Sequence, residues 1–233
     1  MQNGTIPLVM HFSAIILMGG SGTRVDSPVP KQFHPLGQGL VYEQTVRIFQ
    51  ESGLFQEIIL VVHPEWVEQV HVVGTTAVPG GPTRQASSLA GLCGCIKACD
   101  FVMIHDAVRP FVSVDILRKS VARVVECGAV DTCIPSTDTV VRVEERTIEA
   151  IPPRSHFWLG QTPQTFSYPL ICQAHKETKR TNTSDDCQLV MDLGHPIAIV
   201  EGSQENFKIT TEWDLKMAQL LVAAAPDLAH RSK

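Results

Sequence analysis

A glycine-rich stretch, Gly-Gly-Ser-Gly-Thr-Arg at residues 19–24, comes directly after the apolar run 12–18. Glycines let backbone N–H groups approach phosphate oxygens closely, and Arg24 adds a permanent positive charge. Lys31 follows Pro28 and Pro30, two prolines that stiffen the connection. These residues predict a loop that binds phosphate groups. The simpler alternative is a flexible surface turn with solvated charges.

Two familiar phosphate-binding motifs do not fit this stretch. A P-loop requires Gly-Lys followed by Ser or Thr, whereas Gly22 is followed by Thr23 and Arg24. A dinucleotide-binding motif requires an acidic residue at the end of the second strand, where this chain has Val62-His63-Pro64. Kinase and dehydrogenase functions are therefore disfavoured.

The composition limits the possible partners. The chain has 233 residues and a formal net charge of −5, which suits one α/β domain over residues 1–233 and gives no broad basic surface for nucleic acid. No apolar run is long enough to predict a membrane span, and no signal sequence is recognised, so we expect a cytoplasmic protein. The odd cysteine count, seven, suits free thiols, and Cys93, Cys95 and Cys99 lack the partners of a metal site.

The elements that must position the loop alternate between strand and helix. Strands are predicted at 12–18, 57–62, 70–73, 100–105, 129–135 and 197–200, and helices at 41–50, 65–69, 83–98, 113–127 and 212–224. This alternation predicts a Rossmann-like, mostly parallel sheet with helices on both faces. Ligands bind such sheets at the carboxyl ends of the strands, which is where the glycine-rich stretch lies.

A hairpin interrupts the α/β pattern. Residues 139–143 and 147–151 flank a polar turn at 144–146, which predicts an inserted β-hairpin arm within 136–160. An isolated hairpin is marginally stable in water, so this one needs a surface to pack on. We expect a homodimer to supply it.

Five motifs occur together in one order and give the chain a specific resemblance. They are Gly19–Arg24 with Pro30-Lys31-Gln32, Thr83–Ser87, His105–Pro110, Gln161–Gln164 and Asn206–Thr210. From about residue 13 to residue 222, the chain resembles the 2-C-methyl-D-erythritol 4-phosphate cytidylyltransferases and their relatives, the ribitol-5-phosphate cytidylyltransferases. The resemblance implies CTP and a polyol phosphate as substrates and Mg²⁺ as cofactor, held mainly by nucleotide phosphates rather than by protein ligands.

The resemblance also implies a role for individual residues. Those that would stabilise charge on the reacting phosphoryl group are Arg24, Lys31 and Lys208. Those that would contact the nucleotide are Met18, Gly19, Gly20, Gly22, Gly81, Ser87 and Asp106. Those that would bind the acceptor are Asp106, Arg109, Thr139, Arg154 and Thr162, with Arg154 and Thr162 reaching across a dimer. Met18 departs from the small residue usual at its position.

The chemistry is consistent with these roles. An acceptor phosphate is already a nucleophile, so positioning and charge stabilisation suffice without a strong general base. His105 is then expected to be a structural histidine. Ser184 is expected to be a helix N-cap, followed by Asp185 and Asp186 as acids of the first turn that complement the helix dipole. The leading hypothesis is CMP transfer to 2-C-methyl-D-erythritol 4-phosphate in isoprenoid precursor synthesis. The alternatives are transfer to ribitol 5-phosphate and a non-catalytic nucleotide-sensing module.

Overall fold

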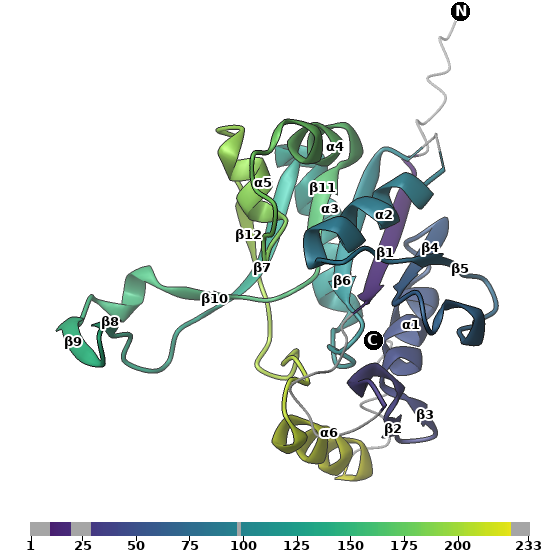
Figure 1. The fold of residues 1–233 in the computed structure, drawn as a ribbon, viewed down its shortest axis with the longest axis horizontal. Helices are drawn as coiled ribbons and strands as arrows, with labels where there is room; N and C mark the ends of the chain where they lie inside the picture. Colours follow the sequence, from purple (N-terminus) through teal and green to yellow (C-terminus); the bar gives the residue numbers. More distant parts are fainter. Residues whose placement is uncertain (1–9, 20–28, 97–98, 225–233) are drawn as a thin grey trace, which may run out of the picture.

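The structure, a computed structural model, describes residues 10–19, 29–96 and 99–224 (Figure 1). Its centre is an eight-stranded sheet in the order β10-β7-β11-β6-β1-β4-β5, with β12 paired to β7. The strands are β1 (Phe12–Met18), β4 (Glu57–Val62), β5 (Thr76–Pro79), β6 (Phe101–Asp106), β7 (Ala129–Pro135), β10 (Trp158–Gly160), β11 (Gln164–Ser167) and β12 (Ala198–Glu201). The pairs β1–β4, β1–β6, β4–β5 and β7–β12 are parallel, whereas β11 runs antiparallel to both β6 and β7. The predicted mostly parallel α/β fold is confirmed.

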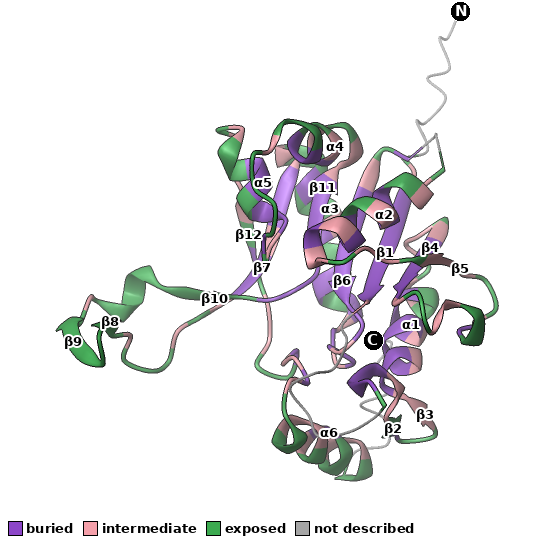
Figure 2. Ribbon diagram, viewed as in Figure 1, coloured by how far each residue is buried: buried purple, intermediate pink, exposed green. Residues whose placement is uncertain are grey.

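Helices cover both faces of this sheet. Alternate residues of β1 point to opposite faces: Ile16 packs with Phe49 of α1 (Val41–Ser52) and Leu117 of α3 (Val114–Cys127). Ile15 packs on the other face with Leu92 of α2 (Arg84–Gly94). The short helices α4 (Tyr168–Glu177) and α5 (Cys187–Asp192) complete that second layer. Figure 2 shows the sheet as the most deeply buried part of the molecule.

Helix α2 approaches the sheet closely because of one glycine. A methyl group added at Gly91 would lie 2.5 Å from Ile15 Cγ2 and 2.9 Å from Val61 Cγ2, which no side chain tolerates. At its N-terminus, the Thr83 hydroxyl accepts a hydrogen bond from the Ala86 N–H (3.1 Å) and so caps the helix. The first turn of α2 is thereby held beside the carboxyl end of β1.

The predicted hairpin is present. Strands β8 (Arg142–Glu144) and β9 (Thr147–Ala150) pair antiparallel, and the turn residues Glu145 and Arg146 have φ angles of 46° and 64°. Such left-handed angles match the right-handed twist of a two-residue hairpin. Together with the 3₁₀ turn Arg154–His156, the hairpin extends well away from the body of the molecule and is almost wholly exposed (Figures 1 and 2).

The remaining elements are short, apart from one helix. They are the 3₁₀ turns Lys31–Phe33 and Val67–Gln69, the short ribbon β2 (Pro35–Leu36) with β3 (Gly39–Leu40), and helix α6 (Glu212–Ala224). Figure 1 shows α6 with β2 and β3 in the lower part of the molecule. The strand predicted at 70–73 is wrong: Val73 is 95% exposed, and the strand beside β4 is β5 instead. The helix predicted at 65–69 is only the 3₁₀ turn. Among the described helices, none is long and apolar enough to cross a membrane.

Candidate active site

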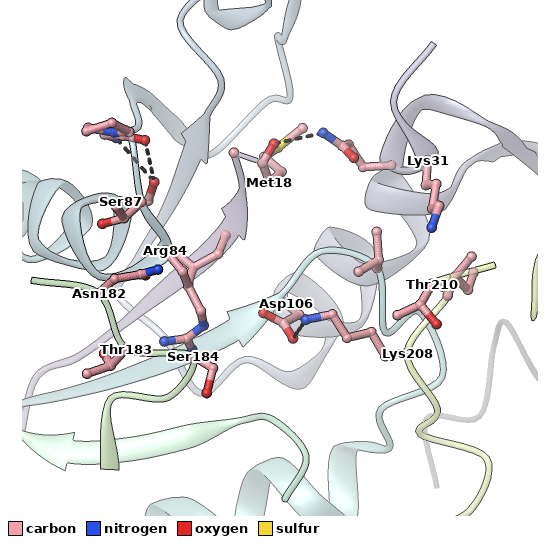
Figure 3. Close-up of a pocket in the computed structure, with 18 residues that line it drawn as sticks. Met18, Lys31, Arg84, Ser87, Asp106, Asn182, Thr183, Ser184, Lys208 and Thr210 are labelled. Atoms are coloured by element: carbon pink, nitrogen blue, oxygen red, sulfur yellow. Dashed lines mark hydrogen bonds and ion pairs between the residues drawn. The ribbon is translucent and has the colours of Figure 1, made fainter. Parts of the chain in front are cut away.

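A cavity of about 490 Å³ opens at the carboxyl ends of β1 and β6 (Figure 3). This is the edge of an α/β sheet where ligands bind. The segments around it are the end of β1, the turn at Lys31, the start of α2, the end of β6, and the loops 182–184 and 208–210. Its described lining consists of Leu17, Met18, Gly19, Lys31, Gln32, Gly81, Pro82, Thr83, Arg84, Ser87, Asp106, Val108, Asn182, Thr183, Ser184, Lys208, Ile209 and Thr210.

Most of the predicted nucleotide and catalytic residues converge on this cavity. Those that line it are Met18, Gly19, Lys31, Gly81, Ser87, Asp106 and Lys208. They come from parts of the chain as far apart as β1 and the loop before α6, so the fold brings together residues that are distant in the sequence. Gly20, Gly22 and Arg24 lie outside the described residues, and their roles stay predictions.

Asp106 is surrounded by positive charge. Its Oδ2 lies 2.8 Å from Lys208 Nζ and 3.7 Å from Arg109 Nε. Burial alone would raise the pKa of Asp106, but the charges of Lys208, Arg84 and Arg109 outweigh it and hold the pKa well below its usual range. The group is therefore a carboxylate at every pH at which the protein would work.

A buried hydrogen-bond chain fixes the backbone of Asp106 from behind. Its N–H donates to Thr162 Oγ1 (3.1 Å), which lies 3.0 Å from His105 Nδ1, and His105 Nε2 lies 3.2 Å from the Arg109 carbonyl. That carbonyl can only accept, so Nε2 carries the ring proton and the Thr162 hydroxyl donates to Nδ1. Burial lowers the pKa of His105 to about 4, which keeps the ring neutral. The expected structural role of His105 is confirmed.

Thr162 is thus placed differently from expectation. Its side chain is 4% exposed and its hydroxyl is engaged with His105 and Asp106 of its own subunit. These contacts within one subunit do not support the predicted reach of Thr162 across a dimer, and its contact with the acceptor stays a prediction. The Thr162 hydroxyl supports the backbone of Asp106, which lines the cavity.

Arg109 is also turned inward. It is 8% exposed, does not line the cavity, and donates from one guanidinium nitrogen to the Asn206 carbonyl (2.8 Å). Burial lowers the pKa of Arg109, although the neighbouring carboxylate of Asp106 opposes that shift. Its charge acts on the site through Asp106, and the predicted contact with the acceptor stays a prediction.

The turn before α2 lines the cavity and is held in shape by Ser87. Ser87 Oγ lies 3.2 Å from both the N–H and the carbonyl oxygen of Gly81 and bridges them (Figure 3). A methyl group at Gly81 would lie 2.4 Å from Ala86 Cβ, so only glycine fits there. Such a rigid turn is suited to reading the polar edge of a base.

Sequence reasoning missed Arg84, which lines the cavity between Ser87 and Asp106 (Figure 3). Its guanidinium donates to Asp186 Oδ2 at 2.7 Å, and Asp186 is fully buried with His175 Nε2 at 3.3 Å from its other oxygen. Ser184 was expected to be the N-cap of this helix, α5, with Asp185 and Asp186 as acidic residues of its first turn. In the structure Asp186 is the N-cap residue of α5, without a side-chain cap hydrogen bond, and Asp185 accepts from the Cys187 N–H (2.7 Å). The signal available was Arg84 itself, which lies inside the Thr83–Ser87 motif.

Thr139 and Arg154 lie on the arm and do not line the cavity. Arg154 is exposed and donates to the Thr137 carbonyl (2.8 Å), and Thr139 is also exposed. Within one subunit, the structure does not bring them to the other predicted acceptor residues. Contact with an acceptor would require a second copy of the chain.

The cavity suits a metal carried by the substrate better than a resident one. Asp106 is the only acidic residue among the described residues that line it, and no group of three or more metal-ligating side chains occurs in the described chain. Mg²⁺ commonly binds through one or two carboxylates together with substrate phosphates. The residues present fit that arrangement, with Asp106 as the available carboxylate.

The chemistry that these groups support is transfer between phosphates. Two lysines, Lys31 and Lys208, face one cavity from distant chain segments, and the Gly81–Ser87 turn provides a separate polar surface. Positive charge fixed around a cavity stabilises negative charge on a transferring phosphoryl group. A polar turn beside it can hold the remainder of a nucleotide.

Comparison with known proteins agrees with this geometry. Residues 12–224 match the family model of 2-C-methyl-D-erythritol 4-phosphate cytidylyltransferase. This chain belongs to that family. Among relatives, the 2-C-methyl-D-erythritol 4-phosphate cytidylyltransferase of Clostridioides difficile (strain 630) is 34% identical over 221 residues, covering 91% of this chain and 93% of the relative. The crystal structure of the 2-C-methyl-D-erythritol 4-phosphate cytidylyltransferase from Thermus thermophilus superposes with a TM-score of 0.80 at 33% identity, covering 92% of this chain and 100% of the other.

The chain is also similar to a cytidylyltransferase that is named for a different acceptor. The ribitol-5-phosphate cytidylyltransferase of Lactiplantibacillus plantarum is 34% identical over 231 residues, covering 90% of this chain and 97% of that protein. Both kinds of relative join a cytidine nucleotide to a polyol phosphate, according to their names. Membership of the family therefore fixes the reaction class more firmly than it fixes the acceptor.

Proposed function

We propose that this protein transfers CMP from CTP to 2-C-methyl-D-erythritol 4-phosphate and releases pyrophosphate. The observation that carries the proposal is the convergence of Lys31, Lys208 and Asp106 on one cavity beside the Gly81–Ser87 turn. The match to the family along residues 12–224 supports the same reaction. The family's activity assigns the reaction to isoprenoid precursor synthesis.

In the proposed reaction, an oxygen of the acceptor phosphate attacks the α-phosphorus of CTP. The new P–O bond forms as the bond to the β-phosphate breaks, and pyrophosphate leaves with that electron pair. Lys31 and Lys208 stabilise the charge that develops, together with Arg24, which lies outside the described residues. Asp106 would hold Mg²⁺ together with the substrate phosphates, and the ion would supply further neutralisation of the developing negative charge.

The proposed active unit is a homodimer. Five large apolar residues of the arm are exposed by between 43% and 63%: Val143, Ile148, Ile151, Trp158 and Leu159. Such a run of exposed apolar side chains is costly in water and favours contact with another protein surface. A second copy would cover these residues and bring Thr139 and Arg154 toward its partner's cavity.

Transfer to ribitol 5-phosphate is the second candidate, because a ribitol-5-phosphate cytidylyltransferase is 34% identical to this chain, although methylerythritol relatives reach 36% and the family model favours them. Steady-state pyrophosphate release with CTP, Mg²⁺ and each polyol phosphate tests both. We expect a kcat/KM at least about tenfold higher for 2-C-methyl-D-erythritol 4-phosphate, since a site built around one polyol leaves polar groups unpaired with another. A preference for ribitol 5-phosphate would overturn the first choice. If CTP binds but no pyrophosphate is released in the presence of either polyol phosphate, the protein would be a nucleotide sensor instead.

A further inference from the structure

The loop that carries Lys208 depends on side chains rather than on secondary structure. Residues 202–211, between β12 and α6, form neither helix nor strand. Within this loop, Asn206 is fully buried and its amide nitrogen donates to Gln161 Oε1 (3.1 Å) and to the Thr162 carbonyl (2.8 Å). One side chain therefore joins the loop to the end of the arm.

Gln161 makes the second half of this connection. Its side-chain nitrogen donates to the Ser203 carbonyl (2.8 Å), and its side-chain oxygen accepts from the Ser203 N–H (3.4 Å) as well as from Asn206. A methyl group added at Gly202 would lie 2.3 Å from that oxygen, so the backbone of the loop rests directly on the amide. The Gln161 N–H itself donates to the Thr132 carbonyl of β7 (2.7 Å), which anchors the residue to the central sheet.

Two further contacts hold the loop near Lys208. Arg109 donates to the Asn206 carbonyl (2.8 Å), and the Ile209 N–H donates to the Val108 carbonyl (2.9 Å). The backbone is thus held two residues before Lys208 and one residue after it. Between these attachments, the Lys208 ammonium group reaches Asp106 at 2.8 Å.

We propose that Gln161 and Asn206 are positioning residues that hold Lys208 against Asp106 and link that contact to the root of the arm. The inference rests on the proposed function for its catalytic consequence. A charge that stabilises a transition state must stay within a fraction of an ångström of its working position. A loop that lacks the backbone hydrogen bonds of a helix or sheet needs side-chain hydrogen bonds to hold it there. Because residue 161 directly follows β10, a displacement of the arm would shift Gln161 and, through Asn206, the position of Lys208.

Asn206→Asp tests the proposal with almost no change of shape. The carboxylate loses both donated hydrogen bonds and faces two acceptor oxygens. We expect kcat/KM for the polyol phosphate to fall about 10²-fold, as misplacement of about 1 Å costs, while CTP binding measured without acceptor changes less than about twofold. Gln161→Met, which keeps the size of the side chain and removes its polar atoms, should act in the same direction.

Two controls separate positioning from general damage. Glu205→Gln alters an exposed side chain in the same loop and should leave kcat/KM unchanged. In a Lys208→Ala background, Asn206→Asp should cause little further loss, because its effect passes through the missing lysine. Losses that multiply in the double variant would overturn the proposal.

A readout independent of turnover measures Lys208 directly. Acetylation of Lys208 by an N-hydroxysuccinimide ester, followed by mass spectrometry, should be several-fold faster in Asn206→Asp and in Gln161→Met than in wild type, since the ammonium loses its hold on Asp106. Thermal unfolding confirms that each variant is folded, and Gly202→Ala replaces any that is not. Unchanged Lys208 labelling would contradict the proposal. Absence of pyrophosphate release by wild type with either acceptor would contradict the proposed function, while the labelling would still decide the positioning role.

Discussion

Lys208 Nζ lies 2.8 Å from Asp106 Oδ2, so two side chains predicted to touch the reactants are paired with each other. The pair sits inside the cavity, and Lys208 keeps 40% of its side chain exposed while Asp106 keeps 10%. The lysine is thus accessible to an incoming phosphate, whereas the carboxylate remains beneath it. A phosphate that binds Lys208 must share it with Asp106.

Asp106→Asn should therefore separate binding from turnover. Removal of the negative charge leaves Lys208 and Arg109 uncompensated, so pyrophosphate should inhibit several-fold more strongly. Turnover should fall about 10²-fold because the position of Lys208 is lost. The inhibition constant and kcat are measured in parallel, with Asp115→Asn, an exposed acid on α3, as the control. Weaker inhibition by pyrophosphate would show that Asp106 attracts the ligand rather than repelling it.

Lys31→Ala should lower turnover far more than CTP binding. The residue lines the cavity across from Arg84, where it can meet charge that appears only during transfer (Figure 3). We expect kcat to fall about 10²- to 10³-fold and the Kd for CTP, measured calorimetrically, to rise less than about tenfold. Lys119→Ala, on the exposed face of α3, should alter neither quantity. Equal losses in both would mean that Lys31 only binds the ground state.

The Arg84–Asp186 pair should stabilise the fold as well as the site. Asp186 is fully buried, so Arg84→Met removes its arginine partner and leaves the carboxylate beside His175 and Ser88, which should lower the free energy of unfolding by about 3 kcal/mol in urea titrations. The KM for CTP should also rise, because the pair ties the start of α2 to the loop 182–186. Arg180→Met, which breaks the exposed pair with Asp192, is the matched control and should cost much less. An equal loss of unfolding free energy in both variants would contradict the prediction that the buried ion pair contributes more stability than the exposed one.

His105 should make stability fall in mild acid. Its pKa is about 4 in the folded protein, below the usual value near 6.5, so the unfolded chain binds the extra proton first as the pH falls. The stabilising contribution is complete above about pH 6.5 and decreases between about pH 6.5 and 4, by about 2–3 kcal/mol at pH 4.5. Urea unfolding of wild type and His105→Gln at about pH 7 and about pH 4.5 measures the difference. An identical pH dependence in both would exclude His105 as its source.

Mixed dimers test whether the arm completes a neighbouring site. Lys31→Ala damages the cavity and Arg154→Ala damages the arm, so each homodimer should be nearly inactive. A heterodimer of the two retains one intact cavity that is completed by an intact arm. If the two sites act independently, we expect it to have roughly half of the activity of the wild-type dimer. Tagged subunits allow the heterodimer to be purified and assayed. Complete inactivity of confirmed heterodimers would argue against sites shared between subunits.

Local sequence patterns were enough to predict much of the framework. The strands 12–18, 57–62 and 129–135 and the helix 212–224 were predicted at the residues where they occur, because apolar runs and helical periodicity are local signals. The strand at 70–73 failed for the opposite reason: β-branched residues favour a strand, but only pairing makes one, and β4 pairs with residues 76–79.

The site was predictable where its motifs carry charge and glycine, as at Lys31, Gly81, Asp106 and Lys208. It was not predictable where the contact joins distant segments. Asn206 and Gln161, which are hydrogen-bonded, are 45 residues apart in the sequence, and Arg84 and Asp186 are 102 apart. No local sequence pattern around any of these residues predicts its partner. Such contacts follow from tertiary structure alone, which is also why the inward turn of Thr162 was missed.

The arm hairpin forms a two-stranded sheet of its own, separate from the eight-stranded one. Its replacement would therefore disturb no strand register in the body of the molecule. A hairpin from a ribitol-type relative could be transplanted in place of residues 138–156 as a cassette, with β7 and β10 left intact. If the arm contacts the acceptor as proposed above, such an exchange would change the choice of polyol while the body of the molecule keeps the chemical step.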